Sequence, residues 1–239
     1  MPTYLTFALA APIGAMGDLA VGERRSSWDR PGRSAVLGLI AACLGLDRAD
    51  EAAHRDLEQG YGLAMRIERL GPLLADYHTA QVPPRRRNHR FATRAEELAA
   101  DDLETILSRR DYRADLVVLC ALWPRGSARW TLDAVADALT APHFAPYFGR
   151  KACPLGLPMK PMLFAHDDPV AALAARAAEG PERGFVSKSQ PREVVLDRAD
   201  VPAGMQPSRI ELRRDALVSR ARWQFALREE AVIAVGPAS

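Results

Sequence analysis

Residues 114–123, Ala-Asp-Leu-Val-Val-Leu-Cys-Ala-Leu-Trp, form a nearly continuous apolar run that is rich in strand-favouring side chains. Such a run is typical of a strand that is buried on both faces in the middle of a sheet. Thr131 follows and can cap a helix that extends to Leu139 and is ended by Pro142. Segment 114–123 therefore predicts the central strand of the fold, with a helix directly after it.

Upstream of this strand, the hydrophobic pattern predicts further strands and helices. The expected strands are residues 4–10, stopped by Pro12, residues 61–67 and residues 73–82; the expected helices are residues 35–44 and 50–58. Ser34 is the expected N-cap of the first helix, and Gly45 is its expected stop. The order strand, helix, strand, strand, helix begins a ferredoxin-like βαββαβ unit, an α+β fold with helices on one face of an antiparallel sheet.

Two regions lie outside this unit. Residues 83–112 form an insertion that a tight hairpin does not need, and it opens with a segment, 83–94, that has five arginines and no acid. The acidic stretch 96–104 that follows is typical of a solvated helix face rather than of a metal site. After Pro161, a helix is expected over 168–179 and strand-like runs over 209–235. We therefore expect a domain at residues 1–158 and a smaller β-rich part at residues 159–239.

The composition sets only broad limits on function. The 239 residues are 48% hydrophobic and 26% charged, with a net charge of +2 and a pI near 8.5. This charge alone does not indicate a nucleic-acid-binding protein. Only three of the 32 cations are lysines, and arginine suits phosphate contacts, although a GC-rich genome would produce the same bias. The three scattered cysteines, and the lack of a signal peptide or membrane-spanning run, predict a cytoplasmic protein without disulfides and without membrane contact.

One short segment carries chemistry suited to nucleic acid. Residues 147–154, Tyr-Phe-Gly-Arg-Lys-Ala-Cys-Pro, combine two aromatic rings, a glycine and two adjacent cations. Aromatic faces can stack on bases, glycine permits close backbone approach, and Arg150 and Lys151 can neutralise phosphates. The alternative is a purely structural loop, in which Tyr147 or Phe148 anchors the chain in the core.

Two other positions are candidates for function. Arg33 and Ser34 place a guanidinium beside the free N–H groups of a helix start, which can bind an anion, although ordinary capping explains the pattern too. His78 could act as a general acid or base. No pair of histidines has the spacing of metal ligands, and no nucleotide-binding or hydrolase motif is present. We therefore expect neither a metal nor a cofactor.

Four segments together resemble the CasD family, the type I-E Cascade subunits of the RAMP superfamily. They are residues 11–17 (Ala-Pro-Ile-Gly-Ala-Met-Gly), 30–34 (Arg-Pro-Gly-Arg-Ser), 76–79 (Asp-Tyr-His-Thr) and 147–154. The resemblance extends from Tyr4 to about Pro158. Met16 departs from it, because the family often has tryptophan there.

The resemblance implies a non-catalytic subunit of a CRISPR antiviral complex that holds the 5′ handle of the guide RNA and caps the backbone filament. It implies a β-hairpin thumb in the insertion, contacts with the CasC backbone subunit and the CasA large subunit, and target DNA reached through the assembled complex. The residues then expected to bind RNA are Arg33, Ser34, Tyr77, His78, Arg85, Arg86, Arg87, Arg90, Tyr147, Gly149, Arg150 and Lys151. Relatives in type I-C systems cut precursor RNA. A metal-independent endoribonuclease that uses His78 with Tyr77 or Lys151 is therefore the alternative, although type I-E complexes carry a separate cutting subunit, CasE.

Overall fold

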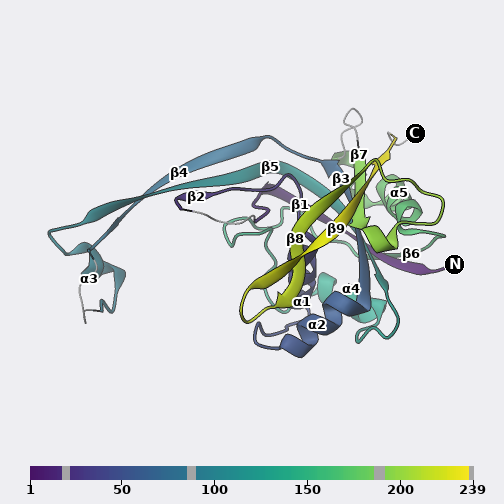
Figure 1. Ribbon diagram of the computed structural model, residues 1–239, viewed down its shortest axis with the longest axis horizontal. Helices are drawn as coiled ribbons and strands as arrows, with labels where there is room; N and C mark the ends of the chain where they lie inside the picture. The colour runs from purple at the N-terminus through teal and green to yellow at the C-terminus, as the bar shows by residue number, and fades with distance from the viewer. Residues whose placement is uncertain (18–21, 85–89, 186–191, 237–239) are drawn as a thin grey trace.

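The computed structural model describes residues 1–17, 22–84, 90–185 and 192–236. Figure 1 shows a rounded body of sheet and helices from which one long β-hairpin extends. The strands are β1 (Thr3–Gly14), β2 (Arg24–Arg25), β3 (Tyr61–Arg69), β4 (Leu73–Val82), β5 (Glu104–Pro124), β6 (Met162–Ala165), β7 (Arg192–Asp197), β8 (Arg209–Ser219) and β9 (Gln224–Val235). The helices are α1 (Arg33–Cys43), α2 (Glu51–Gly60), α3 (Arg94–Leu98), α4 (Leu132–Thr140) and α5 (Pro169–Glu179).

The predicted central strand is confirmed. The described strands form one sheet in the order β6-β1-β5-β3-β7-β9-β8, and β2 and β4 pair with β5 outside this path. β5 is antiparallel to β1, from Leu5 opposite Leu122 to Gly14 opposite Arg113, and to β3 on its other side. Because both edges of its body segment are paired and both faces are covered, residues 116–122 are all buried.

Helices cover both faces of the sheet, and not one face as the sequence predicted. On one face, Phe7 of β1 belongs to a core cluster with Ile40 of α1 and Leu139 of α4. On the other face, Ala8 belongs to a second cluster with Leu173 of α5. Neighbouring residues of β1 enter different cores because successive side chains of a strand point to opposite faces. Each fully buried large apolar side chain contributes about 1.5–3 kcal/mol, so both clusters stabilise the sheet.

Of the two predicted N-caps, Thr131 is confirmed and Ser34 is not. The side chains of Asp50, Thr131 and Asp168 accept hydrogen bonds from backbone N–H groups at the starts of α2, α4 and α5. Gly45 follows α1 with a φ of 76°, as a residue that ends a helix should. Ser34 is not the N-cap of α1, however, because α1 begins at Arg33 with Gly32 at the cap.

Two strand boundaries also differ from the prediction. β1 does not stop at Pro12 but continues to Gly14. Pro12 is accommodated because it has no partner in the register with β5, which passes from Ala11 to Ile13. The strands β6 and β7 were not predicted from the sequence. β6 has only four residues, and β7 begins at Arg192 and ends at Asp197, so charges interrupt its apolar run.

β7 joins the two parts of the chain that the sequence suggested. It pairs with β3 on one side and with β9 on the other, so the sheet continues from residues before position 158 into residues after it. The boundary between the two expected domains stays a prediction. None of the helices in the described ranges is long and apolar enough to cross a membrane.

The long hairpin, which we call the arm, consists of β4 and the first half of β5. The two strands pair from Leu73 opposite Arg113 to Val82 opposite Glu104, and α3 lies at the tip (Figure 1). The excursion from the body therefore begins at β4 and not at residue 83. The acidic stretch after residue 95 is helical only as far as Leu98, and Glu104 already belongs to β5.

Candidate nucleic-acid interface

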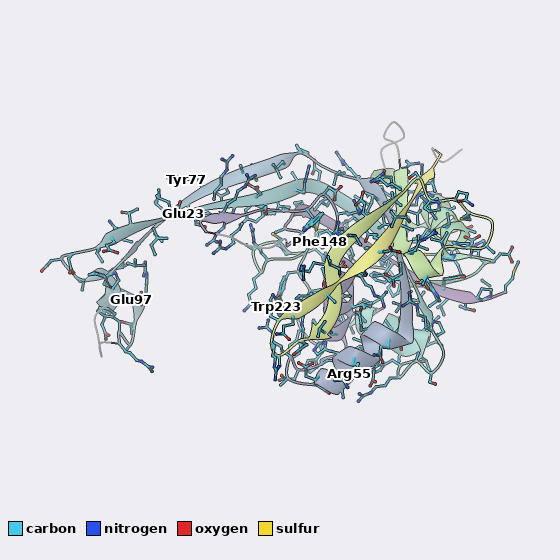
Figure 2. All side chains as sticks on the ribbon, viewed as in Figure 1. Glu23, Arg55, Tyr77, Glu97, Phe148 and Trp223 are labelled. Atoms are coloured by element: carbon cyan, nitrogen blue, oxygen red, sulfur yellow. The ribbon has the colours of Figure 1, made fainter. Side chains whose placement is uncertain are left out.

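Four segments meet along the arm between the body and the middle of the hairpin, and we call this region the arm base. It comprises β2, residues 76–78 of β4, residues 108–112 of β5 and residues 147–151. β2 is parallel to β5, so that Arg24 lies opposite Arg109 and Arg25 opposite Arg110. Figure 2 shows Tyr77 of β4 beside Glu23, which precedes β2. The strand register thus gathers arginines that are far apart in the sequence.

Most cations of the arm base face solvent. Arg25, Arg109 and Arg110 are exposed, and within the described residues none of them forms an ion pair. Arg24 pairs with Asp111 at 2.8 Å, and the carboxylate of Asp111 is buried. The local charge is therefore strongly positive although the net charge of the whole chain is only +2. Such a local surface attracts the phosphate backbone of nucleic acid.

Arg150 attaches its loop to the arm base. Its guanidinium lies 4.6 Å from the ring centroid of Tyr112 and donates to the carbonyl oxygens of Asp111 (3.2 Å) and Arg25 (3.1 Å). These contacts leave Arg150 half-buried, whereas Lys151 is exposed. Of the two adjacent cations that the sequence singled out, Lys151 is the one with its charge freely available.

The loop itself packs tightly on the start of the chain. The backbone N–H of Ala15 donates to the Phe148 carbonyl at 3.0 Å. Gly149 has a φ of 91°, and a Cβ added there would lie 1.7 Å from the Ala15 carbonyl oxygen. The glycine permits a close approach, but to the protein's own backbone. Phe148 and Met16 are both buried at 3% exposure, so Phe148 anchors the loop in the core and Met16 presents no surface for stacking.

Tyr77 and His78 lie on the arm and face different directions. Tyr77 is 63% exposed, and the imidazole Nε2 of His78 contacts the carboxylate of Asp76. Because successive side chains of a strand point to opposite faces, these two residues cannot both face one phosphodiester group. No group of three or more potential metal ligands occurs in the part of the chain that the structure describes.

Arg33 and Ser34 do not join the arm base. Arg33 is 2% exposed, and its Nη2 donates to the carbonyl oxygens of Glu58 and Tyr61 at 2.7 Å each. The backbone N–H of Arg33 donates to the Asp215 carboxylate at 2.7 Å. The anion that this helix start binds is thus a carboxylate of the protein itself, and the geometry does not favour the expected phosphate contact.

Residues 85–89 of the expected Arg-rich tract, 83–94, fall outside the described residues, and Arg85, Arg86 and Arg87 are among them. Arg90 is described and is exposed near the arm tip. Arg94, which follows, pairs with Glu97 at 2.6 Å. The remaining candidate, Tyr147, is 40% exposed and is joined to Pro154 by an isolated β-bridge.

The sequence and fold were compared with known proteins. A model of the family described as CRISPR-associated protein (Cas_Cas5) matches residues 4–229. The chain belongs to this Cas5 family. The Cascade subunit CasD of Escherichia coli (strain K12) is 31% identical over 159 residues, which are 66% of this chain and 70% of that protein. The resemblance that the four motifs indicated is therefore confirmed.

Solved structures show the same fold as this Cas5-family chain. A chain of a CRISPR RNA-guided surveillance complex superimposes with a TM-score of 0.66 and 23% identity, covering 98% of this chain and 91% of that one. A crystal structure of a Cas protein gives a TM-score of 0.64 and 21% identity, covering 98% and 95%. The shared fold is a mixed α/β arrangement around a large antiparallel sheet.

Sequence reasoning missed four residues of this Cas5 site: Arg24, Arg25, Arg109 and Arg110. Each pair was visible as two adjacent arginines, but arginine is so frequent in this chain that neither pair stood out. Their proximity depends on the parallel pairing of β2 with β5, which no local pattern indicates. A search for adjacent pairs of arginines would have been the available signal.

Proposed function

We propose that this Cas5-family protein is a non-catalytic subunit of a Cascade-type CRISPR complex and that its arm base binds the single-stranded 5′ handle of the guide RNA. The observation that carries the proposal is the exposed group of Arg25, Arg109 and Arg110, none of which forms an ion pair within the described residues. Asp76, the cross-strand neighbour of Arg110, contacts His78 instead. Proteins bind single strands by combining a cationic surface with aromatic rings on which bases stack. Membership of a CRISPR-associated family favours guide RNA as the bound nucleic acid.

Tyr77 supplies the aromatic ring at this site. It lies directly opposite Arg109 in the pairing of β4 with β5, and paired residues of neighbouring strands share a face. Tyr77 is 63% exposed, so it does not anchor the core and is open to a ligand. We expect Arg109 to contact a phosphate while Tyr77 stacks on the adjoining base. Arg110 points to the opposite face of the arm, which it shares with Arg25, and we expect these two residues and Lys151 to contact further phosphates of a strand that passes around the arm.

The arm is proposed to be the thumb that contacts the adjacent backbone subunit, the counterpart of CasC. Large apolar side chains on the arm are exposed, namely Leu73, Leu74, Ile106 and Leu107. A two-stranded hairpin is marginally stable in water, so a partner that covers these side chains would stabilise it. A subunit with this contact on one side would cap the filament, lie near a CasA-like large subunit and meet target DNA through the assembled cytoplasmic complex.

The fold supports the ferredoxin-like assignment within this proposal. The segment β6-β1-β5-β3 of the sheet, with α1 after β1 and α4 after β5, follows the expected βαββαβ succession. The β7-β9-β8 part extends the same sheet beyond β3. The site lies on the part of β5 that runs from the middle of the arm to the body.

Neutralising Arg109 and Arg110 together is expected to weaken binding of guide RNA and to reduce its salt dependence. Each lost phosphate contact to a single strand should lower the slope of log K against log salt by about 0.7. The measurement is fluorescence anisotropy with a labelled guide RNA, for the Arg109→Gln, Arg110→Gln double variant at several salt concentrations. Arg129→Gln is the control, because Arg129 is exposed but pairs with Asp56 on α2, in the body. An unchanged slope in the double variant would contradict the arm-base site.

The endoribonuclease alternative predicts a different result. Incubation of the pure protein with precursor RNA in EDTA should leave the RNA intact if the protein only binds it. Specific cleavage that disappears in His78→Ala would overturn the non-catalytic proposal. The opposite orientations of Tyr77 and His78 favour the binding function, because general acid–base catalysis needs both groups within hydrogen-bond reach of the reacting atoms.

A further inference from the structure

A second group of cations and aromatic rings lies at the turn of the β8–β9 hairpin. We call Arg48, Arg220 and Trp223 the Trp223 patch. Trp223 is 55% exposed, and the guanidinium carbons of Arg48 and Arg220 lie 5.0 Å and 4.4 Å from its ring centroid. Figure 2 shows Trp223 at the end of the hairpin, away from the arm. Two cations therefore share one exposed ring.

The turn that displays Trp223 is held in place. The Glu51 carboxylate at the start of α2 accepts hydrogen bonds from the Ser219 hydroxyl (2.9 Å) and from the backbone N–H of Ala221 (2.5 Å). Trp223 has a φ of 56°, a conformation that is uncommon for a residue with a bulky side chain. Anchoring by Glu51 explains how this conformation persists, and it makes the patch a preorganised surface.

The two guanidinium groups of the patch lack neutralising partners. Within the described residues, neither Arg48 nor Arg220 forms an ion pair, and Nε of Arg220 is buried without a hydrogen-bond partner. Burial and the charge of Arg48 lower the pKa of Arg220. Arg129 provides a contrast, because it lies 4.8 Å from the Trp130 ring but pairs with Asp56 at 3.0 Å. An anion bound between Arg48 and Arg220 would relieve their mutual repulsion.

The patch is connected to the arm base by one short loop. Tyr147 is close enough to Arg220 to affect its electrostatics, and Arg150, three residues further along, contacts the arm base. Three residues of extended chain span at most about 10–11 Å.

We propose that the Trp223 patch is a second anion site, at which Arg48 and Arg220 bind the phosphodiester backbone of a single-stranded nucleic acid that also crosses the arm base. Trp223 orients the two guanidinium groups by stacking. The inference rests on the proposed function, because it extends the path of the same strand. The chemistry of the patch suits guide RNA and single-stranded DNA alike, so both are used as probes.

The test measures the salt dependence of binding for the full-length protein. The probes are fluorescein-labelled oligouridylate and oligothymidylate, long enough to reach both sites, and the variants are Arg48→Gln, Arg220→Gln and their combination. Each substitution is expected to lower the slope of log K against log salt by about 0.7. Arg129→Gln is the matched control, since it also removes an arginine stacked on tryptophan. If these variants lower the slope only for the RNA probe, the patch binds the guide RNA. If they lower it only for the DNA probe, the patch binds a DNA strand. Either result supports the site.

The emission of Trp223 gives an independent readout. Oligonucleotide binding at the patch should change the tryptophan fluorescence of the native protein, and the change should be lost in Trp223→Phe. Arg48 is exposed, so Arg48→Gln should melt like the native protein. A native salt slope in the double variant, together with a reduced slope in the Arg109→Gln, Arg110→Gln variant, would overturn this inference and leave the proposed function standing. Failure of the native protein to bind either probe would overturn both.

Discussion

Replacing Arg33 by methionine is expected to lower the free energy of unfolding by about 3–5 kcal/mol, the usual effect of removing one partner from a buried ionic group. Arg33 is buried and lies 3.3 Å from the Glu58 carboxylate and 3.6 Å from that of Asp197. Methionine fills much of the space but leaves the Glu58 carboxylate and two backbone carbonyls without their donor, while Asp197 keeps Arg125 and Arg228. Urea denaturation at neutral pH measures the effect.

The control for this prediction is Arg129→Met, which removes an exposed partner of Asp56 and should cost less than about 1 kcal/mol. A variant of Arg33 that is as stable as the native protein, yet binds RNA with a lower salt slope, would show that Arg33 contacts phosphate after all. That result would restore the sequence-based expectation and contradict the burial argument.

The same substitution has a predictable pH dependence. Burial alone would raise the pKa of Asp197, but Arg33, Arg125 and Arg228 outweigh it and lower the pKa below its ordinary value. A carboxyl whose pKa is depressed by folding stabilises the protein above its unfolded pKa, about 3.9, and loses that contribution as the pH falls through the folded pKa. Burial raises the pKa of Glu58 above its ordinary value although Arg33 opposes this. The difference in stability between native protein and Arg33→Met should therefore narrow as the pH falls, first as Glu58 is protonated and below about pH 4 as Asp197 is protonated.

Replacing Gly149 by alanine is the second change with a large expected effect. The positive φ of 91° costs a residue with a Cβ about 1–2 kcal/mol, and the new Cβ would also lie 1.7 Å from the Ala15 carbonyl oxygen. That backbone atom cannot swing away as a flexible side chain would. The loop must move, and Arg150 would lose its contacts with Tyr112 and Asp111. We expect a loss of more than about 2 kcal/mol of stability together with weaker RNA binding.

Gly126→Ala is the control that separates the cost of backbone strain from the cost of the steric clash. Gly126 also has a positive φ, 61°, but a Cβ there would meet nothing within 4 Å. It should cost only the conformational part, about 1–2 kcal/mol, and leave RNA binding unchanged. Equal melting temperatures for the two alanine variants would show that the loop accommodates the added carbon, and that Gly149 is not required for the close contact with Ala15.

Elements with strong local signals could be predicted from the sequence. The central part of β5 was evident because residues 114–123 are apolar on both faces, and α4 was evident from its capping residue Thr131. The starts of α2 and α5 were predicted at Asp50 and Asp168, and both residues cap their helices. β7 was not predicted because charged residues flank its short apolar core. β4 was expected as a strand, but its place in the arm depends on its pairing with β5, a contact between distant segments.

The candidate site also has some residues that the sequence indicated and others whose role only the structure shows. Tyr77, Arg150 and Lys151, which the motifs at 76–79 and 147–154 singled out, lie in the arm base, and their contacts with RNA stay a prediction. The roles of Arg33 and Gly149 were not visible, since both depend on partners brought up by folding: Asp215 and Glu58 for Arg33, and Ala15 for Gly149.

The sequence by itself determined the family, the central strand, the capped helices and a loop with the residue types that bind nucleic acid. The tertiary structure decided which cations remain available for a ligand. The parallel pairing of β2 with β5 brings Arg25 and Arg110 together at the surface. The packing of α1 against α2 and β8, near the end of β7, instead surrounds Arg33 with the carboxylates of Glu58, Asp215 and Asp197. A guanidinium is chemically the same at each position. Whether its charge is neutralised inside the fold or faces solvent depends on contacts between residues far apart in the sequence, which local patterns do not contain.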